Sequence, residues 1–326
     1  MSTGLLITLY CVLILAASIL GGWLPTLVKL THTRLQLASS FIGGLMLGVG
    51  LLHLLPHAWA ELKSIDQTVQ WFLAGFLAMF FIQRFFHYHK HDVPSEVIPG
   101  EETPDPPEPD GETTTQDLTQ SCGHKHLDHH ESHGETSNPN LKWSWGGAAL
   151  GLTLHTLING MALASAVLSE RRLDEDLAFA GFATFLVIFL HKPFDALTIS
   201  TLMAQGGWSK KARHMVNLLY ALLLPVGVAL FFLGAFQNTE NSATFIGAGL
   251  AFAAGNFLCI AASDLLPELH FHRHDRVSLS AALLLGLALA VVVGVFESRG
   301  HDHNHHHHGH SEPNSAHGAE PNHAHD

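Results

Sequence analysis

Side chains that bind metal ions recur at four-residue spacing in two apolar stretches of the sequence. His155 and Asn159 lie in LTLHTLINGMALA, and His191 and Asp195 lie in VIFLHKPFDALTIS. Residues four apart project from the same face of a helix. Two imidazoles, a carboxylate and an amide carbonyl suit a borderline divalent cation, and the lack of a thiolate favours a site that can release its ion. The spacing therefore predicts one metal site shared by the two stretches.

Two further stretches carry polar and ionisable residues, each close to a proline. His53 and His57 are four apart in GLLHLLPHAWAEL, as are Asp264 and Glu268 in AGNFLCIAASDLLPELH, where Asn256 lies about two turns earlier. Such residues are rare inside a membrane and are candidates for an ion route. Asp264 and Glu268 can equally cap a helix end near the membrane surface. We therefore consider all five as candidate pathway residues.

These motifs must be positioned by helices that cross a membrane. The chain is 47% hydrophobic and only 13% charged, whereas a soluble domain has about 25% charged residues. About 20 apolar residues in a helix span the hydrocarbon core. The stretches that qualify are Leu5–Val28, Leu37–Ala60, Val69–Phe86, Trp145–Leu168, Leu177–Ala204, Met215–Phe236, Ala243–Leu266 and Val277–Phe296. The sequence therefore predicts an all-α integral membrane protein with eight transmembrane helices.

Lys192 stands near the middle of the fifth predicted span, directly after His191. A lysine at this depth is costly, and its side chain is too far from either surface to reach water. It is interpreted as a fixed positive charge beside the metal, as a neutral amine, or as an ion pair with Asp195 or with a carboxylate of another helix. Pro193 follows it and removes a backbone donor, which predicts a kink in this helix.

The distribution of Lys and Arg predicts how the chain is oriented. Most of these residues lie on the side that holds Lys29 and Arg34, and an excess of Lys and Arg marks the cytoplasmic side. Both termini are then expected outside, in a multi-pass protein of the plasma (inner) membrane. A net charge of −12 argues against nucleic acid as a partner, because phosphate binding needs basic surfaces.

Two polar segments interrupt the apolar pattern and define the expected domains. Residues 88–142 are rich in Pro, acidic residues and His, and residues 297–326 contain HDHNHHHHGH. Both lack the apolar residues needed for a core and are predicted to be disordered. The expected organisation is transmembrane helices 1 to 3 in residues 1–87, a cytoplasmic loop in 88–142, transmembrane helices 4 to 8 in 143–296, and an extracytoplasmic tail in 297–326.

Four motifs, taken in order, resemble those of the ZIP (Zrt/Irt-like) metal transporters. They are HLLPHA from His53, HTLING from His155, HKPFD from His191 and DLLPEL from Asp264, and they are similar to that family's second-, fourth-, fifth- and seventh-span motifs. The resemblance implies a 3+2+3 arrangement of eight helices with the metal site on spans four and five. It also implies alternating access, in which spans one, four, five and six move against two, three, seven and eight.

The same resemblance implies the cargo and the partners. The transported ion would be Zn²⁺, with Fe²⁺, Mn²⁺, Cd²⁺ or Co²⁺ as other candidates, and no resident cofactor is expected. A homodimer in the lipid bilayer would be usual for the family. This sequence departs from the two-metal pattern of many members, because Lys192 replaces an acidic ligand and Thr156 replaces an asparagine. We therefore expect one metal ion, with the lysine amine near the second position.

Two other classes share some of these features. A cation-efflux carrier has the spacing of His191 and Asp195 in one span, but such carriers usually have six spans and a folded cytoplasmic domain. An intramembrane zinc hydrolase needs three closed ligands, an activated water and a general base. Ligand pairs on several proline-containing spans favour an ion pathway over such an enzyme.

Overall fold

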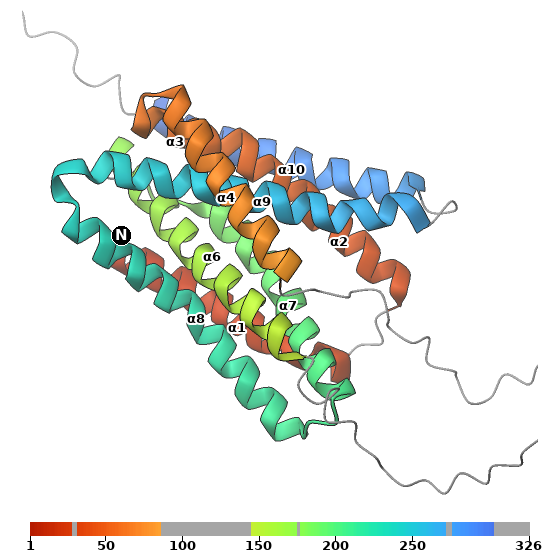
Figure 1. Ribbon diagram of the computed structural model, residues 1–326. Coiled ribbons are helices and arrows are strands. Elements are labelled where there is room, and N and C mark those ends of the chain that lie inside the picture. Colours follow the sequence, from red (N-terminus) through yellow and green to blue (C-terminus); the bar gives the residue numbers. More distant parts are fainter. Residues whose placement is uncertain (28–30, 86–144, 175–176, 272–275, 303–326) are drawn as a thin grey trace, which may run out of the picture.

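The structure is a computed structural model that describes residues 1–27, 31–85, 145–174, 177–271 and 276–302. Within these residues it is a bundle of long helices with no strand (Figure 1). Eight helical spans are long and apolar enough to cross a membrane. The elements are α1 (Thr3–Leu27), α2 (His32–Gly48), η1 (Val49–Leu54), α3 (Leu55–Leu62), α4 (Ile65–Phe85), α6 (Trp145–Leu173), α7 (Phe182–Gln205), α8 (Lys210–Gln237), η2 (Thr239–Asn241), α9 (Ser242–Phe271) and α10 (Arg276–Asp302). The predicted fold class is confirmed.

Several helices continue beyond the ends that hydropathy predicted, and α6 and α10 are two of them. Helix α6 extends to Leu173, past the expected end at Leu168, and α10 extends to Asp302, past Phe296. The extra turns contain charged residues, which a search for apolar stretches excludes. The cytoplasmic loop predicted in 88–142 and the tail from residue 303 onward lie outside the residues that the structure describes.

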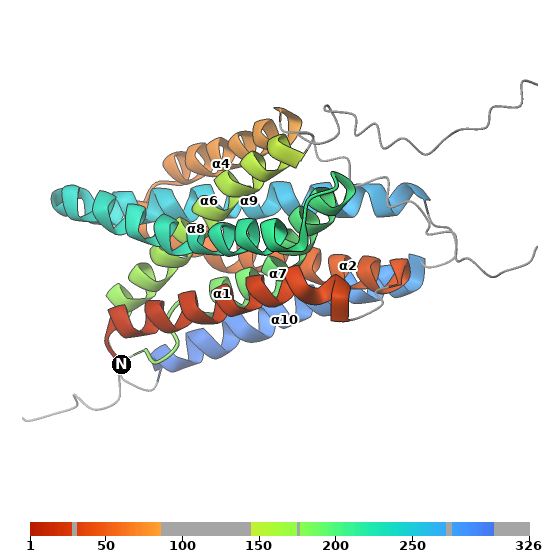
Figure 2. The ribbon, with the colours of Figure 1, turned by 90° about the horizontal axis from the view of Figure 1, so that it is seen from below.

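The helices form two groups. Helices α1, α6, α7 and α8 pack on one another, and α2, α3, α4, α9 and α10 form the other group. In the two views of the bundle, α2 and α10 lie side by side on one flank (Figures 1 and 2). The most extensive contact between the groups is that of α6 with α9. This grouping is the one that the resemblance implies for spans one, four, five and six.

Small residues allow the helices of the first group to approach closely. A Cβ atom placed on Gly160 of α6 would lie 2.3 Å from the carbonyl oxygen of Leu224 in α8. One placed on Gly21 of α1 would lie 2.4 Å from the Cα of Pro193 in α7. Packing in a membrane depends on such close backbone contacts, because lipid is as apolar as the side chains it replaces. The glycines therefore hold α6 and α7 in their places within the group.

The second span is continuous but changes its helical form. Between α2 and α3, residues Val49–Leu54 form a π-helix, in which the Leu55 N–H donates to the carbonyl oxygen of Gly50. Pro56 follows at the start of α3, and its ring would clash with the Leu52 carbonyl in a regular α-helix. The wider turn accommodates the proline. Helix α7, by contrast, is helical on both sides of Pro193.

Candidate metal centre

Helices α6 and α7 bring four of the sequence-predicted residues together in the middle of their spans. The Nδ2 atom of Asn159 lies 2.9 Å from His155 Nε2 and 3.1 Å from His191 Nε2. Asp195 Oδ2 lies 3.7 Å from His155 Nε2 and 3.9 Å from His191 Nε2. Both imidazoles and the amide are buried. The ligand atoms of the two histidines and Asp195 are therefore close enough to hold one ion.

Hydrogen bonds orient the ring of His191 for metal binding. Its Nδ1 lies 2.8 Å from the carbonyl oxygen of Val187, one turn earlier in α7. A carbonyl can only accept, so Nδ1 carries the proton and Nε2 presents its lone pair to the centre. A backbone partner of this kind fixes the tautomer of many metal-binding histidines.

The amide of Asn159 lies where the two imidazole lone pairs converge. Its Nδ2 faces both Nε2 atoms, and its Oδ1 is buried without a hydrogen-bond partner among the described residues. An N–H group and a metal cation both bind an imidazole nitrogen through its lone pair. Rotation of the amide would turn Oδ1 toward the same point, where it can serve as a weak fourth ligand.

Lys192 is completely buried next to this centre. Its Nζ donates to Thr156 Oγ1, to the Tyr220 hydroxyl at 2.9 Å and to Asp195 Oδ2 at 3.4 Å. The Tyr220 hydroxyl in turn donates to Asp195 Oδ2 at 3.1 Å. The ion-pair partner expected for Lys192 is thus Asp195, supported by hydroxyls from α6 and α8. Such a network offsets the cost of placing an ammonium in the membrane interior.

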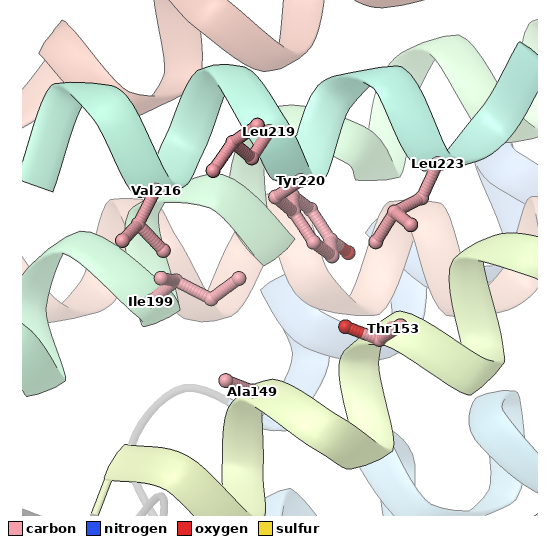
Figure 3. A pocket seen from close by; sticks show the side chains of 7 residues that line it. All are labelled: Ala149, Thr153, Ile199, Val216, Leu219, Tyr220 and Leu223. Atoms are coloured by element: carbon pink, nitrogen blue, oxygen red, sulfur yellow. The ribbon is translucent and has the colours of Figure 1, made fainter.

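Sequence reasoning missed Tyr220. The residue lies in VNLLYALLLP, within an apolar span, and the chain contains only 3 tyrosines. A buried tyrosine hydroxyl usually finds a partner, so its depth in the sixth span was the available signal. It also borders a cavity of about 250 Å³ (Figure 3). The cavity is lined by Ala149, Thr153, Ile199, Val216, Leu219, Tyr220 and Leu223.

The second-span histidines lie elsewhere. His53 Nε2 is 3.0 Å from Glu170 Oε1 and 3.1 Å from Glu297 Oε2, and the His53 and His57 rings are 4.7 Å apart. Glu170 is on α6, 15 residues after His155, which corresponds to roughly 22 Å along the helix axis. Sequence reasoning missed both glutamates, because each lies beyond the end predicted for its span.

Of the three seventh-span residues, Asn256 alone has a described side chain. Asn256 is buried on α9, and its Nδ2 donates to the Phe252 carbonyl of the same helix at 3.1 Å. The backbone at Asp264 and Glu268 belongs to α9, but their side chains lie outside the described structure. The three remain candidate pathway residues only.

Comparisons with known proteins agree with the motifs. Residues 4–294 match the family model described as ZIP Zinc transporter. Human zinc transporter ZIP13 is 26% identical over 255 residues, covering 72% of this chain and 63% of that protein. Zinc transporter ZIP9 of Micropogonias undulatus is 29% identical over 123 residues, covering 37% of this chain and 38% of that protein. Zinc transporter foi of Drosophila melanogaster is 32% identical over 120 residues, covering 37% and 15%.

Each of these alignments spans less than two thirds of the relative's own length. The family model, in contrast, covers nearly all of this chain, from the first span to the last. A match of this extent, with eight apolar helices in two packed groups, leaves one assignment. The chain belongs to the ZIP zinc transporter family.

Proposed function

We propose that the chain carries a divalent cation, zinc in the first place, across the membrane into the cytoplasm. The ion is bound between α6 and α7 by His155, His191 and Asp195, with Asn159 as a weaker ligand. One observation carries this proposal: two imidazole Nε2 atoms converge on a single buried point beside a carboxylate, within helices that can span a bilayer. The relatives' names as zinc transporters support the choice of ion.

Binding in this site is an exchange of partners. An arriving ion takes the two Nε2 lone pairs that the Asn159 amide occupies, and the amide turns to offer Oδ1. The Asp195 carboxylate contributes negative charge at a distance of 3.7–3.9 Å from the imidazole nitrogens. Nitrogen and oxygen ligands without a thiolate suit zinc and, more weakly, iron, manganese, cobalt and cadmium. Such a set favours release as well as capture.

All four ligands belong to α6 and α7, which lie in the same helix group. An ion bound to them can travel with that group while α2, α4, α9 and α10 stay in place. The proposal therefore includes alternating access by relative movement of the two groups. The end of the bundle that holds the start of α2 faces the cytoplasm, as the Lys and Arg distribution predicts.

Lys192 restricts this site to one ion. Two divalent ions a few ångströms apart repel strongly where the dielectric constant is low. The Nζ atom lies beside Asp195, where it supplies one positive charge in the neighbourhood of a second ion. The proposal further comprises a homodimer in the plasma (inner) membrane, no resident cofactor and no hydrolytic activity.

Transport by purified protein in liposomes tests the proposal. Zinc accumulation is followed with an indicator dye inside the vesicles. His155→Ala and Asp195→Ala should each lower uptake by at least about 100-fold, more than the loss of a residue that only supports a ligand. The matched control is His214→Ala, an exposed histidine on α8, which should transport at the wild-type rate.

Circular dichroism and gel filtration are used to check that the variants remain folded. Wild-type uptake by both His155→Ala and Asp195→Ala would refute the site. If the wild-type protein released a hydrolysis product from peptide or lipid substrates and moved no metal, the hydrolase would be the correct class instead.

A further inference from the structure

A second cluster of side chains that can bind a metal ion lies at the C-terminal end of α6, between the two helix groups. It consists of His53 on η1, Glu170 on α6 and Glu297 on α10, and we call it the end cluster. Glu170 is 2% exposed, His53 7% and Glu297 9%. The two carboxylates come from different groups, because α6 packs with α7 and α8 whereas α10 packs with α2.

Backbone groups at the start of α7 orient both carboxylates. Glu170 Oε2 accepts a hydrogen bond from the N–H of Gly181 at 2.8 Å, and Glu297 Oε1 accepts one from the N–H of Ala183 at 3.0 Å. Each carboxylate therefore has one anchored oxygen and one oxygen directed at His53 Nε2. Metal-binding carboxylates are held by supporting hydrogen bonds of this kind.

The described protein groups alone do not satisfy the central contact. A single imidazole nitrogen, His53 Nε2, lies 3.0 Å from Glu170 Oε1 and 3.1 Å from Glu297 Oε2. It carries at most one proton, so it can donate a full hydrogen bond to only one of them. Glu297 Oε2 in fact accepts no hydrogen bond from the described residues. A buried carboxylate oxygen without a hydrogen-bond donor costs free energy, and a bound cation would offset that cost.

The distances suit a metal ion. Tetrahedral zinc with ligands at about 2.0–2.1 Å has ligand atoms about 3.3 Å apart, close to the spacing of His53 Nε2 from the two carboxylate oxygens. A ring nitrogen of His57 lies within the same small volume as the His53 and Glu170 ligand atoms. All four side chains line one cavity of about 400 Å³, which has room for water ligands and contains no Lys or Arg among its described lining residues.

We propose that His53, Glu170 and Glu297, with His57 as a fourth ligand, form a second divalent-cation site. The site takes Zn²⁺ or a similar ion with nitrogen and oxygen ligands. Because its ligands come from both helix groups, a bound ion joins the groups at this end of the bundle. The proposal goes beyond transport at the centre on α6 and α7 and does not require it.

Metal counting on the full-length protein tests the proposal. After equilibrium dialysis against free Zn²⁺ at a fixed concentration, bound zinc is measured by mass spectrometry. Glu170→Gln combined with Glu297→Gln should bind one ion fewer than wild type. Each Gln keeps an oxygen that can accept the hydrogen bond from the N–H of Gly181 or Ala183. Zinc bound by histidines outside the described structure is the same in both proteins and cancels in the comparison. The matched control is Glu61→Gln, a carboxylate at the same end that contacts Ser169 and Arg172 instead.

Location is established separately by anomalous scattering at the zinc edge from crystals of the unmodified protein. A peak at about 2.0–2.2 Å from His53 Nε2, Glu170 Oε1 and Glu297 Oε2 supports the site. Equal zinc in wild type and the double variant, or no such peak at saturating zinc, would overturn it. The two proposals fail separately. In a protein that already carries His155→Ala and His191→Ala, adding Glu170→Gln and Glu297→Gln should still lower the bound zinc by one ion. This result does not depend on whether that protein transports zinc.

Discussion

The centre on α6 and α7 and the end cluster use the same kinds of side chain but assemble them differently. The centre takes every proposed ligand from one helix group and includes its own cation, Lys192, in contact with Asp195. The end cluster takes its proposed ligands from both groups, and no Lys or Arg is found among the described residues that line its cavity. The carboxylate of the centre is thus neutralised by a lysine of the same helix. The end cluster has no such lysine or arginine among its described lining residues, and it forms only where both helix groups meet.

This difference assigns the two proposed sites different behaviour during transport. An ion at the centre can move with α6 and α7 without losing a ligand. An ion at the end cluster loses either Glu170 or the other three ligands, His53, His57 and Glu297, whenever the groups separate. By this reasoning the centre suits carriage, and the end cluster suits an ion that is bound in one conformation only.

The largest effect is expected from reversing the charge of Lys192. Lys192→Glu replaces the internal cation with a carboxylate beside Asp195, which lies 3.4 Å from the lysine amine. Two carboxylates and two imidazoles then have the charge to hold a second divalent ion. Bound zinc, counted after dialysis as above, should rise by one ion per chain.

Lys210→Glu is the control for this reversal, because Lys210 is exposed at the start of α8. It should leave the count unchanged. If Lys192→Glu also binds the wild-type number of ions, Lys192 serves only as the structural ion-pair partner of Asp195. The proposed difference in charge between the two sites would then have no effect on metal binding.

An intermediate effect is expected from removing the hydroxyl of Tyr220, and almost none from removing the hydroxyl of Tyr10. Tyr220→Phe deletes the donor to Asp195 Oδ2 and an acceptor of Lys192. Loss of such a supporting contact should weaken zinc binding at the centre about 10-fold. Tyr10→Phe is the matched change on α1, where the ring stacks on Phe185 and the buried hydroxyl has no hydrogen-bond partner in the described structure.

The Tyr10 variant should bind and transport zinc within about 2-fold of wild type, since no hydrogen bond is lost. The measurement is the zinc concentration for half-maximal uptake in liposomes. Equal values for the two variants would mean that the hydroxyl of Tyr220 does not support Asp195.

The smallest effect is expected from truncation after Asp302, which keeps α10 whole and removes the His-rich residues 303–326. Clustered histidines bind zinc loosely, and the tail begins shortly after Glu297. Uptake should fall a few-fold at low external zinc and stay unchanged at saturating zinc. In a Glu297→Gln background the truncation should make no further difference. Loss of uptake at saturating zinc would contradict a role limited to concentrating the ion.

Most of the fold was predictable because a membrane leaves few alternatives. Each span needs about 20 apolar residues, which predicted the eight helices, and the four motifs indicated the family. Both predictions are confirmed. Helical spacing placed His155 with Asn159 and His191 with Asp195 on single helix faces, and the ligand chemistry predicted that the two pairs meet. Their role as ligands stays a prediction. For Lys192 the sequence left open a fixed charge beside the metal, a neutral amine, or an ion pair with Asp195 or another carboxylate. In the structure its Nζ lies 3.4 Å from Asp195 Oδ2.

What the sequence could not reveal depends on contacts between distant segments. Glu170 and Glu297 follow the apolar stretches and have the appearance of ordinary polar residues at a membrane surface. They are buried only because α6 and α10 continue past the expected ends and meet the start of α7. Tyr220 was missed for a related reason, since a tyrosine in an apolar span has no spacing pattern that indicates its partner.

The π-helix of the second span has a consequence for insertions and deletions. A single wide turn is equivalent to one extra residue in an α-helix, and one residue corresponds to about 100° of rotation. The turn therefore sets the angle between the part of α2 that packs on α10 and the part that carries His53 and His57. Deleting one residue from Val49–Leu52 would remove the extra residue of the wide turn and rotate both imidazoles away from Glu170. The rotational register of this helix is therefore as necessary to the end cluster as its side chains are.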